Sequence, residues 1–252
     1  MRFAEKLVQA YFDYAYNVVY DFTTARLSRF RNLQDRCVAE LGMAEGDRVL
    51  CVGLGTGNEI PRILGANMTV ELTGIDYSKT ALKRAIRKAE KLSKNIDVRL
   101  MDARNLDFAP ESFDKVLCIH VMDFVGDNRD QEKATREIMR VLKSGGKFVV
   151  TYPSDREEKL GRSLLRDVIR DNLDSGKHPF RAFWSLVVQM LTGLVYLPLL
   201  ARPGRSFYSS HELQTMIGRL AGGDFQIEEY VSYQDLIAFG KRLNGGGKPD
   251  AF

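Results

Sequence analysis

The chain has 252 residues, of which 44% are hydrophobic and 28% charged, and its formal net charge at pH 7 is +4. This is the composition of an ordinary globular protein with enough apolar material for a sizeable core, and the mild positive charge gives no indication of a nucleic-acid partner. Three cysteines cannot all pair, so reduced thiols and a cytoplasmic location are expected. The three histidines lie far apart and no cysteine pair has C-x-x-C spacing, so no metal site is predicted.

The first 44 residues form a segment rich in aromatic side chains. Apolar residues recur at three- and four-residue spacing over 3–41, which predicts helix. The beginning of the chain lacks the continuous apolar run of a signal peptide. Such a segment usually packs on the domain as a helical layer, and the alternative is a lid that closes over a bound ligand.

Residues 45–153 alternate between strand and helix patterns. Strands are expected at 48–52, 69–74, 97–101, 115–119 and 147–152, with helices at 58–64, 79–93 and 130–142. This alternation predicts a parallel sheet with right-handed crossovers, whose ligands bind beyond the carboxyl ends of the strands. The ends of the first four strands carry Gly53–Gly57, Asp76, Asp102 and His120 with Asp123. One crevice is therefore expected to contain all of them.

The glycine loop in 49–60, VLCVGLGTGNEI, is the most informative stretch. A strand that breaks into glycines lets backbone approach a ligand closely, and the N–H groups of a following helix favour an anionic group. The third glycine comes one residue earlier than in the G-x-G-x-x-G pattern of dinucleotide-binding folds. Asp76 follows at about the distance at which an acidic residue accepts hydrogen bonds from a ribose, or it caps a helix, as Ser78 also could. Asp102 either receives an adenine amino group or is a solvated loop residue.

In this order the motifs resemble those of the class I S-adenosylmethionine-dependent methyltransferases, over about residues 45–153. The matching stretches are VLCVGLGTG, GIDYS, MDARNLDF, FDKVLCIHVMDF and REIMRVLKSGGKFVV. The resemblance implies a Rossmann-like α/β fold with a seven-stranded, mostly parallel sheet, and an antiparallel last strand pair at 225–231 and 233–241. It implies S-adenosylmethionine as the cofactor, bound by Gly53, Gly55, Thr56, Gly57, Asp76, Tyr77, Asp102, Ala103 and His120. Cys51 departs from the pattern, because the family usually has an acidic residue there.

Within this class, VGLGTGNEIP, RLMDARNLDF and RVLKSGGKFV most resemble the branch that methylates quinone precursors or phospholipids. A small lipophilic acceptor is therefore expected, either quinone-like or another aromatic or lipid, with a phospholipid or amine N-methyltransferase as the alternative. His120 is the candidate base, since an imidazole titrates near neutral pH, or it simply packs beside its strand. The candidates for acceptor contacts are Tyr20, Asp123, Tyr152, Tyr208 and His211. The rival classes are an aminopropyl transferase, a cofactor-binding protein without turnover and an NAD-binding dehydrogenase.

Residues 154–212 are expected to form a helical insert, or cap, after the fifth strand. Residues 183–200 carry no charge and would extend about 27 Å as a helix, short of a hydrocarbon core of about 30 Å. A crossing here would also separate the last strands from their sheet, so no transmembrane span is predicted. The segment is instead buried against the domain or a second subunit of a homodimer, covers an apolar acceptor, or contacts a membrane surface through 181–205.

Residues 213–244 are expected to form a closing helix and strand pair, with Ser210 as the cap of that helix. Residues 245–252 resemble a loose tail. The whole chain, 1–252, is thus interpreted as a single methyltransferase domain.

Overall fold

The computed structural model describes residues 10–24, 27–65, 69–155, 170, 183, 184, 187, 206–230 and 235–243. Most of the predicted insert, including 188–200, and the predicted tail lie outside the described residues. Within the described part of the chain, no helix is long and apolar enough to cross a membrane.

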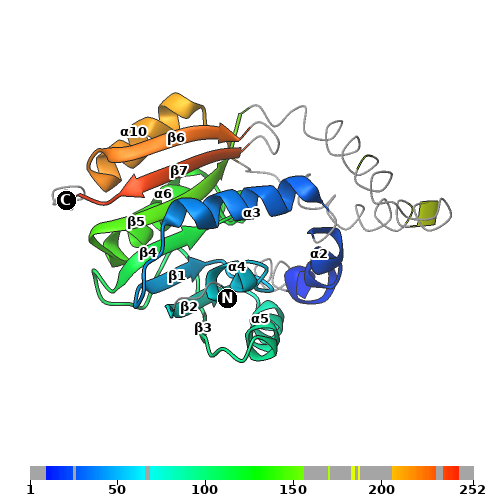
Figure 1. Cartoon of the computed structure of the whole chain (residues 1–252). Helices are drawn as coiled ribbons and strands as arrows, with labels where there is room; N and C mark the ends of the chain where they lie inside the picture. Colours follow the sequence, from blue (N-terminus) through cyan, green and yellow to red (C-terminus); the bar gives the residue numbers. More distant parts are fainter. Residues whose placement is uncertain are drawn as a thin grey trace.

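A seven-stranded sheet forms the centre of the molecule (Figure 1), with strand order β3-β2-β1-β4-β5-β7-β6. β1 to β5 pair in parallel, while β7 runs antiparallel between β5 and β6. The strands are β1 (Arg48–Val52), β2 (Glu71–Asp76), β3 (Asp97–Leu100), β4 (Phe113–Cys118), β5 (Leu142–Pro153), β6 (Asp224–Tyr230) and β7 (Asp235–Lys241). The predicted Rossmann-like sheet with an antiparallel strand near its end is confirmed. β5 begins earlier than expected, because Leu142 already pairs with Phe113 of β4.

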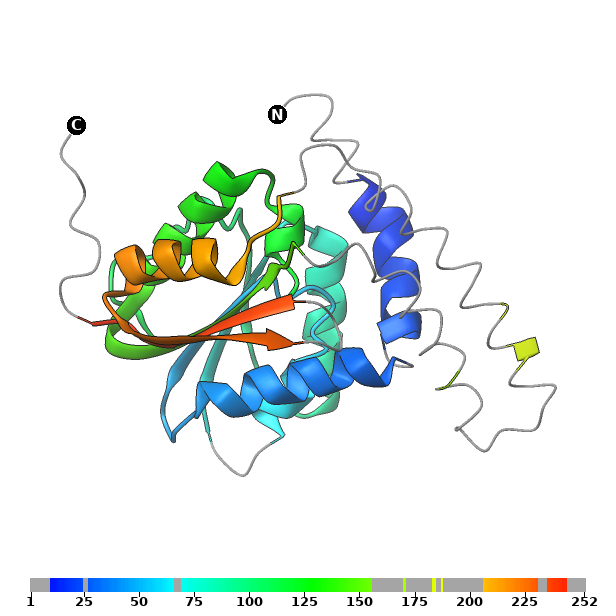
Figure 2. The ribbon, with the colours of Figure 1, turned by 90° about the horizontal axis from the view of Figure 1, so that it is seen from above.

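Helices cover both faces of this sheet, and Figure 2 shows α6 and α10 on the face opposite α3. Strand side chains alternate between the faces, so Leu50 and Val52 belong to the core beneath α6 and α10, whereas Val49 and Cys51 belong to the core beneath α3, α4 and α5. The helices are η1 (Phe12–Tyr16, a π-helix), α2 (Asn17–Thr24), α3 (Ser28–Leu41), α4 (Ile60–Leu64), α5 (Lys79–Lys91), η2 (Met122–Phe124, a 3₁₀ helix), α6 (Asn128–Val141) and α10 (Ser210–Ala221).

The N-terminal segment departs from the single helical block expected over 3–41. α2 ends at Thr24, and Leu27 has extended backbone before α3 begins at Ser28. α3 lies along the sheet, whereas α2 lies beyond the carboxyl ends of the parallel strands (Figure 1). The break therefore separates a helix of the core layer from one placed over the strand ends.

Two serine caps were predicted, and one of them is wrong by a residue. Ser78 caps α5 by accepting a hydrogen bond from the Ala81 N–H, as expected. α10 is capped by Ser209 rather than Ser210, because only Ser209 stands three residues before Glu212 and forms a reciprocal capping box with it. The Ser210 hydroxyl donates to Glu229 instead.

Candidate active site

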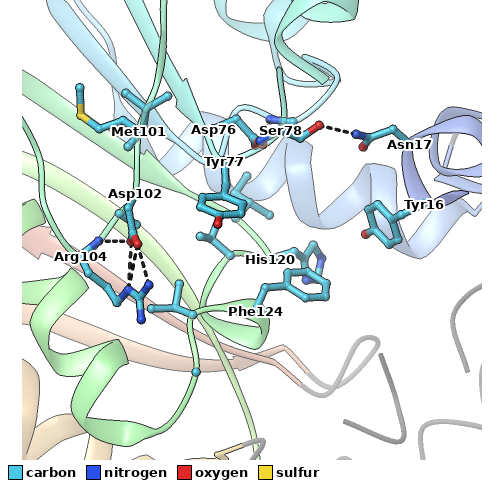
Figure 3. Close-up of a pocket in the computed structure, with 18 of the residues that line it drawn as sticks. Tyr16, Asn17, Asp76, Tyr77, Ser78, Met101, Asp102, Arg104, His120 and Phe124 are labelled. Carbon is cyan, nitrogen blue, oxygen red and sulfur yellow. Dashed lines mark hydrogen bonds and ion pairs between the residues drawn. The ribbon is translucent and has the colours of Figure 1, made fainter. Parts of the chain in front are cut away.

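A cavity of about 390 Å³ lies beyond the carboxyl ends of β1, β2 and β4. Figure 3 shows Asp76 and Asp102 on the side of the strand ends, with Tyr16 and Asn17 of the N-terminal helices across from them. The cavity therefore lies between the sheet and the segment that the sequence suggested as a lid. It is the crevice expected for a parallel sheet.

The floor of the cavity is backbone, contributed by Gly53 and Gly55. Both residues have positive φ angles, +70° and +55°, which L side chains rarely adopt. A Cβ on Gly53 would lie 2.1 Å from Cγ2 of Val121. Glycine at this position leaves room for Val121 beside the loop, and the backbone of Gly53 and Gly55 lines the cavity.

Asp76 binds this loop to the end of β2. Its Oδ2 accepts a hydrogen bond from the Gly55 N–H at 2.8 Å, and its Oδ1 accepts one from the Ser78 N–H at 2.7 Å. Burial raises the pKa of the Asp76 carboxyl to about 6, although the backbone N–H groups oppose the shift. Above that pH the cavity contains a buried carboxylate, a strong acceptor for hydroxyl donors.

Asp102 lines the cavity farther along, at the end of β3. Burial raises the pKa of its carboxyl, but hydrogen bonds from Arg104 outweigh burial, and the pKa lies below its ordinary value. The Arg104 guanidinium donates to Asp102 at 2.6 Å (Figure 3). It also donates to Asp130 at 3.0 Å. Asp102 is half-buried, with 35% of its side chain exposed, and a cation that also lines the cavity fixes its orientation.

The N-terminal helices are joined to the cavity rim by polar contacts. Asn17 Nδ2 donates to the buried Ser78 hydroxyl at 2.8 Å. Lys88 of α5 donates to Asp21 of α2 at 2.9 Å and to Asn58 at 2.6 Å, and the Thr56 hydroxyl also donates to Asp21. We call the Asp21–Lys88–Asn58–Thr56 group the polar latch. It connects α2 both to the glycine loop and to the helix that follows β2.

His120 occupies the end of β4 in an unusual backbone conformation, with φ +54°. Non-glycine residues in this region are strained, and two contacts hold the residue there. Its N–H donates to Thr151 Oγ1 at 2.8 Å, and its ring stacks on Phe30 with centroids 5.1 Å apart. The imidazole is thereby fixed at the cavity wall.

Two carboxylates flank this imidazole. His120 Nδ1 lies 3.2 Å from Oδ2 of Asp235 on β7 and 3.9 Å from Oδ2 of Asp123. Burial lowers the pKa of His120, but the charges of Asp235 and Asp123 together outweigh it, so the pKa lies above its ordinary value. Possible ligand atoms of the three side chains lie within 4.8 Å of one another, and the absence of a metal site stays a prediction.

Aromatic rings surround the region near His120. Tyr16 stacks on Tyr20 with centroids 5.2 Å apart and meets Phe124 edge-on at 6.0 Å. Tyr20 in turn meets the Phe30 ring edge-on at 5.8 Å. This part of the cavity therefore combines an aromatic wall with the imidazole of His120.

The cavity brings together most of the predicted cofactor residues: Gly53, Gly55, Asp76, Tyr77, Asp102, Ala103 and His120. Thr56 and Gly57 do not line it. Thr56 is fully buried and bonded to Asp21, and the missing Cβ of Gly57 leaves space for Ile60 and Ala85, where helices α4 and α5 pack. These two residues support the loop instead of facing its ligand.

Of the predicted acceptor contacts, Tyr20 lines the cavity and Asp123 reaches it through His120. The other three candidates lie elsewhere. The Tyr152 hydroxyl is buried against Thr135 at 2.7 Å, Tyr208 packs edge-on against Tyr152, and His211 is exposed on α10. Tyr152 and Tyr208 belong to the core beneath α6 and α10, so their placement gives them no path to a ligand in this cavity.

The structure adds residues that the sequence analysis did not select, namely Tyr16, Asn17, Arg104, Phe124, Asp130 and Asp235. Asp130 and Asp235 come from α6 and β7, far along the chain from the motifs they join. Arg104 and Phe124 lie within or beside recognised motifs, so proximity to those motifs was the available signal. No local pattern singles out Asp235.

The sheet has this strand order with antiparallel β7, a glycine loop after β1, and acids after β2 and β3. These features together are typical of the class I S-adenosylmethionine-dependent methyltransferases. The family model described as "Methyltransferase domain" matches residues 50–150. The chain is 36% identical over 142 residues to a phosphatidylethanolamine N-methyltransferase of Cereibacter sphaeroides, covering 56% of this chain and 66% of that one. It is 30% identical over 176 residues to a ubiquinone biosynthesis O-methyltransferase of Alkalilimnicola ehrlichii, covering 63% and 68%.

Among solved structures, the PH0226 protein of Pyrococcus horikoshii OT3 has the same fold. Its TM-score is 0.60 at 19% identity, and the match covers 90% of this chain and 98% of that one. The chain described here belongs to the class I methyltransferase family and is an S-adenosylmethionine-dependent methyltransferase.

The cavity fits this cofactor on its own geometry. The backbone of Gly53 and Gly55, which lines the cavity at positive φ, would suit close approach of the methionine part, and the buried Asp76 carboxylate would suit the ribose hydroxyls. Met101, Asp102 and Ala103 would flank the adenine. When bound, S-adenosylmethionine supplies a methyl group activated by its sulfonium. The tasks of this chain are then to align an acceptor, exclude water and accept a proton where the acceptor must lose one.

Proposed function

We propose that the enzyme methylates a lipophilic acceptor bound between the aromatic wall and His120. The observation that carries the proposal is the wall itself: Tyr16, Tyr20 and Phe124 line the cavity beside the imidazole of His120. Rings in this arrangement favour burial of an apolar or aromatic group. Valine and isoleucine side chains at 119, 121 and 125 extend the same apolar lining.

In this proposal His120 is the general base. The carboxylates of Asp235 and Asp123 favour the protonated imidazole, so they help the ring to take a proton from a phenol, an enol-type carbon acid or an ammonium group. Residues 10–24 act as a lid, because the polar latch holds α2 over the cavity and a closed site excludes water.

A second candidate, N-methylation of a lipid amine, is supported by the two carboxylates. They place negative charge behind His120, and the rings of Tyr16, Tyr20 and Phe124 offer faces for a cationic headgroup. The similarity to a phosphatidylethanolamine N-methyltransferase is in keeping with this candidate. The similarity to a ubiquinone biosynthesis O-methyltransferase is in keeping with an oxygen acceptor, such as a phenol, instead.

The test is a matched panel of acceptors, each offered with and without a hydrocarbon tail. Prenylated and unprenylated catechols represent oxygen acceptors, and phosphatidylethanolamine and glycerophosphoethanolamine represent amines. Formation of S-adenosylhomocysteine and the mass of the methylated product are measured. We expect turnover only with a tailed member, and His120→Gln should remove it while donor binding persists. Equal turnover of the tailless partners would disprove a lipophilic acceptor.

A further inference from the structure

The outer face of α5 carries a row of cations that the site does not use. Lys79, Lys83, Arg87 and Lys91 recur every four residues along the helix and are exposed to solvent. Residues four apart lie on one face of a helix, so these four side chains form one line, which we call the basic stripe. Glu90 is the only acidic residue of α5.

The basic stripe differs from the two cations on the inner side of the same helix. Arg84 and Lys88 contact the N-terminal helices, where Arg84 donates to the Asn17 carbonyl and Lys88 to Asp21. In the part of the chain that the structure describes, no ion pair joins a stripe residue to an acid. The inner cations serve the fold and its lid, and the outer four are available to a partner.

The stripe is partly unfavourable for the helix itself, although the helix dipole favours Lys91 in the last turn. Like charges four residues apart destabilise a helix, and Lys79 lies in the first turn, where the helix dipole disfavours a cation. An extended anionic partner would reverse both effects.

The position of α5 indicates which anionic partner fits. Its cap Ser78 and the preceding Tyr77 line the cavity, so the stripe begins at the cavity rim. Tyr77 is 36% exposed, and Tyr14 on η1, which packs against α5, is 77% exposed. Aromatic side chains beside basic residues are typical of surfaces that meet the interfacial region of a bilayer. A nucleic acid would also match the charge, but it gives no reason for the stripe to adjoin a cavity that accepts a lipophilic molecule.

We propose that the basic stripe on α5 docks the enzyme on anionic phospholipid membranes, with the rim of the cavity at the bilayer surface. The surface is distinct from the apolar segment at 181–205 considered in the sequence analysis. The inference rests on the proposed function for its purpose, a lipophilic acceptor, but its test needs no turnover. Each cation near an anionic surface adds to the attraction, which falls off within a Debye length.

The test is flotation of the full chain with phosphatidylcholine vesicles that either contain about one-third phosphatidylglycerol or lack it. Wild type should bind the anionic vesicles and be released by salt. Lys83→Glu/Arg87→Glu should weaken binding by at least about thirtyfold, since each cation contributes about a factor of five near such a surface. Lys83→Gln/Arg87→Gln should show a smaller loss in the same direction.

The matched control is Arg129→Glu/Lys133→Glu. It replaces one arginine and one lysine that are also four residues apart and exposed, but on α6, across the sheet from α5. This control should keep wild-type vesicle binding, and melting curves should show that both variants remain folded. Three outcomes would each overturn the proposal: equal losses of vesicle binding in the two Glu variants, equal binding of wild type to neutral vesicles, and binding to a single-stranded RNA homopolymer without binding to vesicles.

Failure of this proposal and failure of the proposed function give different results. If wild type binds anionic vesicles through the stripe but methylates only tailless acceptors, the docking surface is supported and the lipophilic acceptor is disproved. If wild type methylates a tailed acceptor in detergent but binds no vesicles, the docking surface alone is disproved.

Discussion

The Asp76 carboxyl lies buried at the end of β2, and its pKa of about 6 is raised by that burial. We propose that Asp76 binds the ribose of the donor in its ionised form, since hydroxyl groups donate to a carboxylate more strongly than to a carboxylic acid. A raised pKa also means that the folded state gains stability as Asp76 protonates, so loss of binding in acid is separate from any unfolding through this group.

We therefore expect the affinity for S-adenosylmethionine to be constant above about pH 7 and to fall about tenfold per pH unit below about pH 6. Calorimetric titrations across this range measure it, with melting curves at each pH as the control. Asp76→Asn should weaken binding about tenfold to a hundredfold at pH 8 and remove the inflection. An inflection that persists in this variant would assign the titration to another group.

The pKa of His120 gives a second test of a single residue, and this test needs no acceptor. The chain has three histidines, so the imidazole proton signals can be assigned with His120→Gln and titrated by NMR. We expect the pKa of His120 to lie above 6.5, because Asp235 and Asp123 stabilise the imidazolium against the opposing effect of burial. Asp235→Asn should lower the pKa and move the rise of the pH–rate profile toward acid. Exposed His211 serves as the internal reference, and an unchanged His120 pKa would exclude Asp235 as a positioning residue.

Sequence alone predicted the residues that are held by local geometry. Gly53, Gly55 and Asp76 occur in one strand–loop–strand unit, where spacing along the chain fixes spacing in space. Tyr16 of η1 lines the same cavity, and Asp235 of β7 contacts His120 in its wall. Both placements depend on the assembled sheet and on the path of the N-terminal helices. Thr56 and Gly57 show the converse, because a residue inside a recognised motif can support the loop without facing its ligand.

At the scale of elements, the contact between α2 and α5 decides how the cavity is covered. The polar latch is only partly exposed, with Lys88 28% and Asp21 31% accessible. An ion pair of this exposure contributes about 0.2–1 kcal/mol. A contribution of this size fits the proposed role of residues 10–24 as a lid, because losing it costs little free energy.

Lys88→Met should loosen α2 without unfolding the domain. Hydrogen exchange of residues 10–24 should accelerate by up to about fivefold, the equivalent of about 1 kcal/mol, and the affinity for the donor should fall by a similar factor. Lys143→Met is the matched control, since Lys143 pairs with Asp114 at 2.6 Å on the α6–β5 side. If both variants change exchange in α2 equally, the latch has no specific role.

Periodicity predicted strands β1 to β5 and helices α4, α5 and α6, and the family resemblance predicted β6 and β7. Neither predicted η1, η2 or the breaks between elements. The apolar spacing of 3–41 continues across the junction at which α2 ends and α3 begins, so only tertiary packing reveals the break. β5 extends back to Leu142 because Phe113 of β4 offers it a partner, and a partner strand is not a local property of the sequence. The cap of α10 could have been predicted from the sequence, since Ser209 and Glu212 have capping-box spacing.

For the molecule as a whole, the donor site joins the two cores. Gly53 and Gly55 follow β1, whose side chains enter both hydrophobic clusters, and Val121 opposite Gly53 packs on the core beneath α6 and α10. A ligand that contacts this loop therefore stabilises the sheet from its centre. Any molecule that binds only the folded state raises the free energy of unfolding by mass action.

S-adenosylmethionine at about one hundred times its Kd should add about 2.7 kcal/mol and raise the melting temperature by roughly 5–10 °C. Gly53→Ala should abolish this rise, because the new Cβ would lie 2.1 Å from Val121 Cγ2 on a backbone of φ +70°. Gly145→Ala is the matched control: its φ is +75°, and the space around its Cβ is open among the described residues. Both variants carry a similar backbone strain, so both should melt below wild type without ligand, Gly53→Ala the lower of the two because of its contact with Val121. Only Gly145→Ala should keep the full ligand-induced rise. A full rise in Gly53→Ala would mean that the donor does not bind against the glycine floor.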